Sequence, residues 1–240
     1  MMRGRVEVVA DEKALATTAA ARIVARLSQR QGKRAVALTG GRTPEGLYHL
    51  LATEPYRSRI PWEDTHWFWG DERFVAHDDV RNNARMAIDA LLSRVPVPAR
   101  NIHRIRTDVP GPAESARLYE GALREFHGGR PLDSGEPLFT LVLMGMGSDG
   151  HTASLYAGDP VLDEKRHWVA PVAEAKLEPF VPRVTLTYPA LASTQEMLFV
   201  VGGSDKREAI ARIERGEPLP AARATSRGEL VWLIERSAKN

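Results

Sequence analysis

The chain has 240 residues, of which 33 are Lys or Arg and 31 are Asp or Glu, so its formal net charge is only +2. It contains no cysteine, which excludes a cysteine nucleophile, a thiolate zinc site and a disulfide framework. Basic residues are spread along the chain, which disfavours nucleic-acid binding, and no run of 18 apolar residues indicates a membrane span. We expect a cytoplasmic protein with one domain over residues 1–240 and a monomer slightly favoured.

Eight short apolar runs predict β-strands, and their nearly uniform hydrophobicity is typical of strands covered on both faces. They are Val6–Ala10, Ala35–Thr39, Trp67–Trp69, Phe139–Met144, Trp168–Pro171, Val184–Leu186, Met197–Val201 and Val231–Ile234.

Three helical patterns lie between these runs, each an apolar stripe with residues three or four apart. The first is expected to end near Gly32 and the second before Gly128. Their members are Leu15, Ala19, Ile23 and Leu27; Ala116, Tyr119, Leu123 and Phe126; and Ile210 with Ile213. Alternating strands and helices predict an α/β fold with an open, mostly parallel sheet and helices on both faces. In such a fold ligands bind beyond the carboxyl ends of the strands.

The loop after the second predicted strand reads Gly40-Gly41-Arg42-Thr43 and leads into Pro44. Thr43 fits a helix N-cap and Pro44 the first helical position. The free N–H groups of a helix start suit a phosphate, two glycines allow close approach, and Arg42 can add a charged contact. An ordinary tight turn is the alternative, and the spacing is not that of a Walker loop.

The loop after the third predicted strand carries Asp71, Glu72 and Arg73. Either carboxylate can hold sugar hydroxyls or pair with a cation, and Arg73 can bind phosphate or stabilise developing negative charge. A solvated loop with a local ion pair is the alternative. Further along, Asn83 precedes a predicted helix at Ala84–Leu92 and is either a substrate contact or only its cap.

The most apolar predicted strand is followed by a loop with three glycines and His151. A histidine at a strand's carboxyl end can act as a general base near neutral pH. Asp149, two residues earlier, is a candidate for orienting or tuning the imidazole. Gly147, Gly150 and Thr152 are candidate substrate contacts, and Thr152 also fits the cap of a following helix.

The sequence has no motif for metal binding, dinucleotide binding or a serine nucleophile. The remaining six histidines lack such a context, and no metal-ligand spacing occurs, so we expect neither metal nor cofactor. The Gly-x-Gly lacks the third glycine of the dinucleotide fingerprint. No G-x-S-x-G nucleophile elbow is present, so water activated by a base is the favoured hydrolytic chemistry.

Together these segments resemble the 6-phosphogluconolactonase family, which shares a superfamily with the glucosamine-6-phosphate isomerases/deaminases. The resemblance extends over nearly the whole chain, and the string from Asp149 to Leu155 is its most specific part. The matching stretches are 38–44, 70–75, Asn83 with Met86-Ala87, 145–155, 182–187, Gly202-Gly203 with Lys206, 219–221 and Trp232.

The resemblance implies a Rossmann-like α/β domain and hydrolysis of 6-phospho-D-glucono-1,5-lactone in the oxidative pentose phosphate pathway. His151 matches the family's proton acceptor. Further positions resemble its phosphate and substrate contacts, namely Gly40, Gly41, Arg73, Arg183 and Lys206. Thr39 and Arg42 stand where the family often has serines, and Asn82 where Ser is common.

Two other functions remain as alternatives. The related isomerases/deaminases carry a Glu five residues after the loop histidine, and here that position is Tyr156, which favours the lactonase. A non-catalytic sugar-phosphate sensor with a related fold would usually carry a helix-turn-helix. The chain begins almost directly with its first predicted strand, so we expect no such segment.

Overall fold

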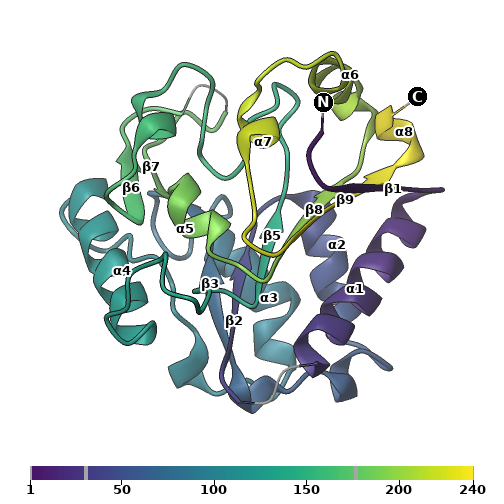
Figure 1. Cartoon of the computed structure of the whole chain (residues 1–240). Coiled ribbons are helices and arrows are strands. Elements are labelled where there is room, and N and C mark those ends of the chain that lie inside the picture. Colours follow the sequence, from purple (N-terminus) through teal and green to yellow (C-terminus); the bar gives the residue numbers. More distant parts are fainter. Residues whose placement is uncertain (1, 30–31, 176–177, 240) are drawn as a thin grey trace.

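The computed structural model describes residues 2–29, 32–175 and 178–239 (Figure 1). Its main sheet has six strands in the order β1-β9-β8-β5-β2-β3, and every neighbouring pair is parallel. The strands are β1 (Arg5–Val9), β2 (Arg34–Leu38), β3 (Thr65–Trp69), β5 (Leu141–Met144), β8 (Glu196–Val201) and β9 (Glu229–Glu235). The predicted α/β fold with a mostly parallel sheet is confirmed.

Helices flank this sheet. They are α1 (Glu12–Ser28), α2 (Arg42–Leu51), α3 (Asn83–Ala90), α4 (Pro112–Phe126), α5 (Tyr188–Ala192), α6 (Arg207–Glu214), α7 (Pro220–Arg223) and α8 (Arg236–Lys239). Helix α2 packs against both α1 and α3, and α6 packs against α8. No helix in the described ranges is both long and apolar enough to span a membrane.

A second, antiparallel sheet was not predicted. It contains β4 (Asp71–Arg73), β7 (Arg183–Leu186) and β6 (Val169–Val172) in the order β4-β7-β6, and it lies with α4 at one side of the molecule, away from α1 (Figure 1). Asp71–Arg73 was predicted as a loop, which is wrong. Polar residues are uncommon in strands, and the strand with which this segment pairs lies more than a hundred residues further along the chain, so the sequence gives no local sign of it.

Gly70 joins the two sheets. Its N–H donates to the Leu38 carbonyl at the end of β2 (2.8 Å), and its carbonyl accepts from the Leu186 N–H of β7 (2.8 Å). The chain therefore passes from β3 into β4 without an intervening loop. This junction brings the small sheet to the carboxyl end of the main sheet.

The predicted stripe on α1 faces the core. Leu15, Ala19, Ile23 and Leu27 are all at most 1% exposed. Asp11 caps the helix by accepting a hydrogen bond from the Ala14 N–H (2.8 Å). This burial makes α1 a fixed support for the strands whose ends carry the polar loops.

Candidate functional site

A cavity of about 250 Å³ lies where β2, β5 and β8 end and the small sheet begins. This is the position expected for a ligand in an open α/β sheet. The predicted site residues that line it are Gly40, Gly41, Arg42, Thr43, Asp71, Arg73, Asn83, Gly147, His151, Thr152, Arg183 and Lys206. Three other predicted site residues, Glu72, Asp149 and Gly150, lie outside the lining.

The loop after β2 enters its helix earlier than predicted. Helix α2 begins at Arg42 with Gly41 as its N-cap, so the prediction that Thr43 caps the helix and Pro44 opens it is wrong. The reason is the backbone of Gly41, whose φ of 109° is open to glycine and turns the chain directly into the helix. The first amides of α2 have no acceptor within the helix and border the cavity, as an anion site requires.

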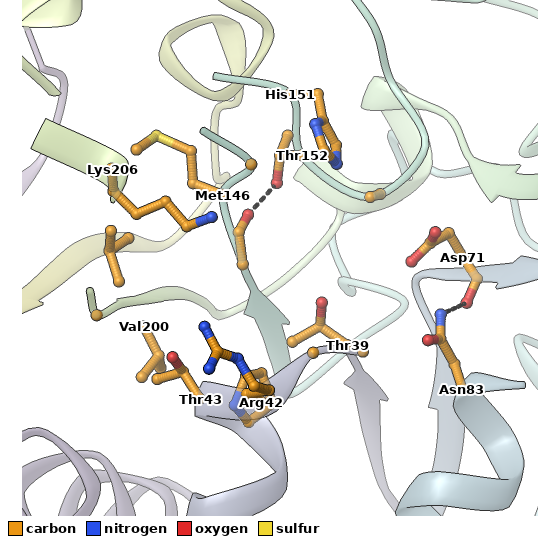
Figure 2. A pocket seen from close by; sticks show the side chains of 18 of the residues that line it. Thr39, Arg42, Thr43, Asp71, Asn83, Met146, His151, Thr152, Val200 and Lys206 are labelled. Carbon is orange, nitrogen blue, oxygen red and sulfur yellow. Dashed lines mark hydrogen bonds between the residues drawn. The ribbon is translucent and has the colours of Figure 1, made fainter. Parts of the chain in front are cut away.

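Gly40 lets the first loop approach Asn83. A Cβ at Gly40 would lie 2.0 Å from Asn83 Oδ1, so no larger residue fits beside this amide. Asn83 Nδ2 donates to the Asp71 carbonyl (3.0 Å), as Figure 2 shows. The cap of α3 is Asn82, whose side chain accepts from the Arg85 N–H (2.9 Å). Asn83 is therefore free of the capping role and turns to the cavity.

Two arginines form a cross-strand pair in the small sheet. Arg73 of β4 is paired in register with Arg183 of β7, and both line the cavity. Arg183 is only 3% exposed, and burial lowers the pKa of its guanidinium. It is held by the carbonyls of Val181 (3.2 Å) and Pro179 (2.8 Å). Within the described ranges neither guanidinium forms an ion pair, although the charge of Asp71 acts on Arg183 from a distance, so both can take up a ligand anion.

Glu72 does not line the cavity and instead binds backbone groups that support it. Its side chain is fully buried and accepts hydrogen bonds from the N–H groups of Arg73 (2.8 Å), Asn83 (2.7 Å) and Ala84 (2.8 Å). It therefore joins β4 to the start of α3. Burial raises the pKa of this carboxyl to about 8, against the three N–H groups that favour its ionised form.

We predict that Glu72 makes stability fall with rising pH. The folded-state pKa of about 8 lies above the ordinary 4.5, so the contribution is complete below about pH 4.5 and is lost as pH rises through about 8. The loss should be on the order of a few kcal/mol. Urea unfolding of wild type, Glu72→Gln and the exposed-site control Glu63→Gln checks this. Equal pH slopes for wild type and Glu72→Gln would contradict it.

The loop after β5 holds the imidazole of His151 through Asp149. Asp149 Oδ1 accepts from both the backbone N–H of His151 (3.0 Å) and its Nδ1 (2.6 Å). Burial opposes ionisation of Asp149, but the hydrogen bond and charge of His151 outweigh it and lower the pKa of the carboxyl. An ionised carboxylate only accepts, so Nδ1 carries a proton, and in the neutral imidazole Nε2 is the nitrogen with the free lone pair.

The glycines of this loop make room for that arrangement. A Cβ at Gly147 would lie 2.1 Å from His151 Nδ1, so a side chain there would displace the ring. Gly150 has a φ of 86°, and a Cβ would lie 2.5 Å from Leu219 Cδ1, so this residue shapes the loop without lining the cavity. Thr152 Oγ1 donates to the Gly145 carbonyl (2.7 Å) and precedes no helix, so its predicted capping role is wrong.

Sequence reasoning gave no site role to Tyr156 and Ser154. The Tyr156 ring packs against His151 with centroids 4.7 Å apart, and the residue lines the cavity. Ser154 Oγ donates to Asp71 Oδ2 (2.7 Å) within the buried wall. Burial raises the pKa of Tyr156, so its phenol stays neutral. Both residues lie within five positions of His151 in the sequence, and this closeness is the feature from which a role in the site could have been predicted.

The cations of the cavity form two groups. Figure 2 shows Arg42, Thr43 and Lys206 at one side of the cavity, and Asp71 with Asn83 at the other. The second group includes Arg73 and Arg183, because Arg73 lies on β4 with Asp71 and is paired with Arg183 of β7. Asp205, which sequence reasoning did not single out, pairs with Lys206 at 2.8 Å. In residues 2–29, 32–175 and 178–239, no cluster of three His, Asp or Glu is arranged to hold a metal ion.

Fold and site together define an α/β protein with a cationic cavity at the strand ends and a histidine–carboxylate pair at its edge, which suits a small anionic ligand. Residues 10–232 match the family described as glucosamine-6-phosphate isomerases/6-phosphogluconolactonase. The chain belongs to this family.

Relatives along the full length carry one of the family's two activities in their names. A 6-phosphogluconolactonase of Nostoc sp. is 37% identical over 99% of this chain and 98% of the relative. One of Synechocystis sp. is 35% identical with the same coverage. The crystal structure of 6-phosphogluconolactonase from Thermotoga maritima superposes with a TM-score of 0.83 at 30% identity, covering 97% of this chain and 99% of that one.

Proposed function

We propose that this protein hydrolyses 6-phospho-D-glucono-1,5-lactone to 6-phospho-D-gluconate, a step of the oxidative pentose phosphate pathway. Relatives at 37% and 35% identity over the full chain are named for this activity. The observation that carries the chemistry is the 2.6 Å contact between His151 Nδ1 and Asp149 Oδ1 at a cavity rich in unpaired cations.

The 6-phosphate is assigned to the side of the cavity formed by Gly41, Arg42, Thr43 and Lys206. The free amides at the start of α2 and two positive side chains suit a phosphoryl group. The family resemblance places Arg73 and Arg183 among the phosphate and substrate contacts, together with Lys206. Their place beside Asp71 and Tyr156 favours a different role, at the reacting end of the substrate.

At the reacting end, His151 acts as general base. Its Nε2 takes a proton from water as the water oxygen attacks the lactone carbonyl carbon C1. The carbonyl oxygen becomes an oxyanion, and the unpaired guanidinium groups of Arg73 and Arg183 stabilise it. When the bond from C1 to the ring oxygen breaks, His151 returns its proton to that oxygen. The product is an open chain with a carboxylic acid at C1, which then releases its proton to water and becomes the carboxylate.

Asp149 and Tyr156 support the base without touching the reacting atoms. Asp149 fixes the tautomer of His151 and stabilises the imidazolium that forms. Tyr156 packs on the ring. Because a neutral phenol stands beside the imidazole where a deaminase relative has a carboxylate, the acid–base group for an amino-sugar isomerisation is missing at this position.

The test is acid release from freshly generated 6-phosphoglucono-1,5-lactone, with the spontaneous rate subtracted. The wild type should hydrolyse this lactone at least about a hundredfold more efficiently than unphosphorylated gluconolactone, because the phosphate supplies the binding that positions C1. A rate no higher than background would overturn the proposal. Equal efficiency on both lactones would overturn the assignment of the phosphate.

A further inference from the structure

One cavity cation already has an anion beside it. Four positively charged side chains line the cavity, those of Arg42, Arg73, Arg183 and Lys206. Of these four, only Lys206 forms an ion pair within the described residues, and its partner is Asp205. Its Nζ lies 2.8 Å from Asp205 Oδ2. Asp205 also lines the cavity, and its carboxylate interacts electrostatically with Arg42 as well as with Lys206, which places it on their side. A ligand anion entering this side therefore meets a negative charge bound to one of its own partners.

The backbone holds this carboxylate in place. Asp205 lies in the short 3₁₀ helix Ser204–Lys206, which follows Gly203 with a φ of 94°. A Cβ at Gly203 would lie only 2.6 Å from Asp205 Oδ1, so the glycine leaves room for the carboxylate to fold back. The Gly203 N–H is fixed by Glu235 Oε2 at 2.9 Å. The ion pair is thus supported by a turn that glycine alone allows.

We infer that Asp205 competes with incoming phosphoryl groups for Lys206 and so weakens the binding of phosphorylated substrate and product alike. This inference rests on the proposed function, because it takes the Arg42–Lys206 side as the phosphate site. The carboxylate neutralises Lys206 while the site is empty. An entering phosphate must share Lys206 with Asp205 or displace it. Weaker binding of the phosphate favours release of the product, which carries two anionic groups, the 6-phosphate and the C1 carboxylate.

The charges of Lys206 and Asp205 act in opposite directions on an incoming anion. Lys206 attracts it, while Asp205 repels it and occupies its donor. Asp205 is 55% exposed and Lys206 is 21% exposed, so water and salt screen the pair in part. Removing the carboxylate charge should tighten anion binding about fivefold, the factor that corresponds to about 1 kcal/mol.

A purely positioning role for Asp205 predicts the opposite sign. If the carboxylate served to aim Lys206 at the phosphate, its loss would free a flexible ammonium and weaken binding. The direction of the change therefore separates the two roles. The isosteric Asp205→Asn variant keeps the shape of the loop and removes only the charge.

The experiment measures binding of inorganic phosphate and of 6-phosphogluconate by calorimetry at low ionic strength. The proteins are the wild type, Asp205→Asn and the control Glu208→Gln, which removes an equal charge outside the cavity lining. We expect dissociation constants about fivefold lower for both anions in Asp205→Asn, no change in the control, and a smaller difference at high salt. Unchanged or weaker binding in Asp205→Asn would overturn the inference, as would a wild type that binds neither anion.

Kinetics then separate this inference from the proposed function. In Asp205→Asn the KM for the phosphorylated lactone should fall by a similar factor of about five, whereas Glu208→Gln should leave it unchanged. If the wild type does not hydrolyse the lactone while Asp205→Asn still binds phosphate more tightly, the proposed function fails and the inference stands. If hydrolysis is confirmed and KM does not fall, the inference fails alone.

Discussion

The His151→Ala variant is expected to lose kcat for 6-phosphoglucono-1,5-lactone by roughly 10²–10⁴-fold, the range of a general base. The cavity would keep Arg73, Arg183 and the phosphate side, so substrate binding should persist and KM should change little. Some catalysis above the spontaneous rate should also remain, because oxyanion stabilisation and positioning do not need the imidazole.

The matched control is His49→Ala, which removes an exposed histidine on α2 outside the cavity lining. Its kcat should equal that of the wild type. His151 is partly buried, with its side chain 22% exposed, so thermal unfolding must establish that both variants are folded. A folded His151→Ala variant with full kcat would leave the lactonase reaction in place and remove His151 as its base.

The strand ends could be predicted from the sequence because parallel strands buried on both faces are short apolar runs. Each polar loop after such a run then falls at one edge of the sheet, which is why residues from positions 40 to 206 meet in one cavity. Lys206 follows β8 in this way. Its counter-ion Asp205 could not be recognised, because an adjacent acid and base in a sequence are usually both solvated.

The small sheet could not be predicted, because its pairing is set by tertiary contact. Asp71 and Glu72 are polar residues that disfavour a strand, yet both are buried, one against Ser154 and the other against the start of α3. The sequence offers a pair of carboxylates, and only the fold separates them. Asp71 lines the cavity, while Glu72 binds backbone N–H groups.

The distinction between two arginine environments is likewise a property of the fold. Arg42 and Arg183 are both candidate phosphate ligands from the sequence, yet Arg42 is exposed on α2 and Arg183 is buried between carbonyl groups. Burial without a carboxylate partner costs free energy, which a bound anion can offset. The register of β4 and β7, which fixes Arg73 opposite Arg183, is what gives this pair its chemistry.

Two substitutions at Asp149 should separate orientation of the imidazole from its charge. In Asp149→Asn, the backbone N–H of His151 still requires an oxygen at the Oδ1 position, so the amide should present its oxygen and keep the Nδ1–H bond. Only the negative charge is lost, and kcat should fall about tenfold, the difference between a charged and a neutral hydrogen bond. In Asp149→Ala the ring is also released, and kcat should fall about a hundredfold or more.

Comparison of the two variants decides whether Asp149 orients the base. A general base works only while Nε2 points at the attacking water, so release of the ring should cost more activity than loss of the charge alone. If Asp149→Asn and Asp149→Ala lose the same activity, the hydrogen bond to Nδ1 does not orient the base. The base would then have to be oriented by its packing on Tyr156 and by the space that Gly147 leaves for the ring.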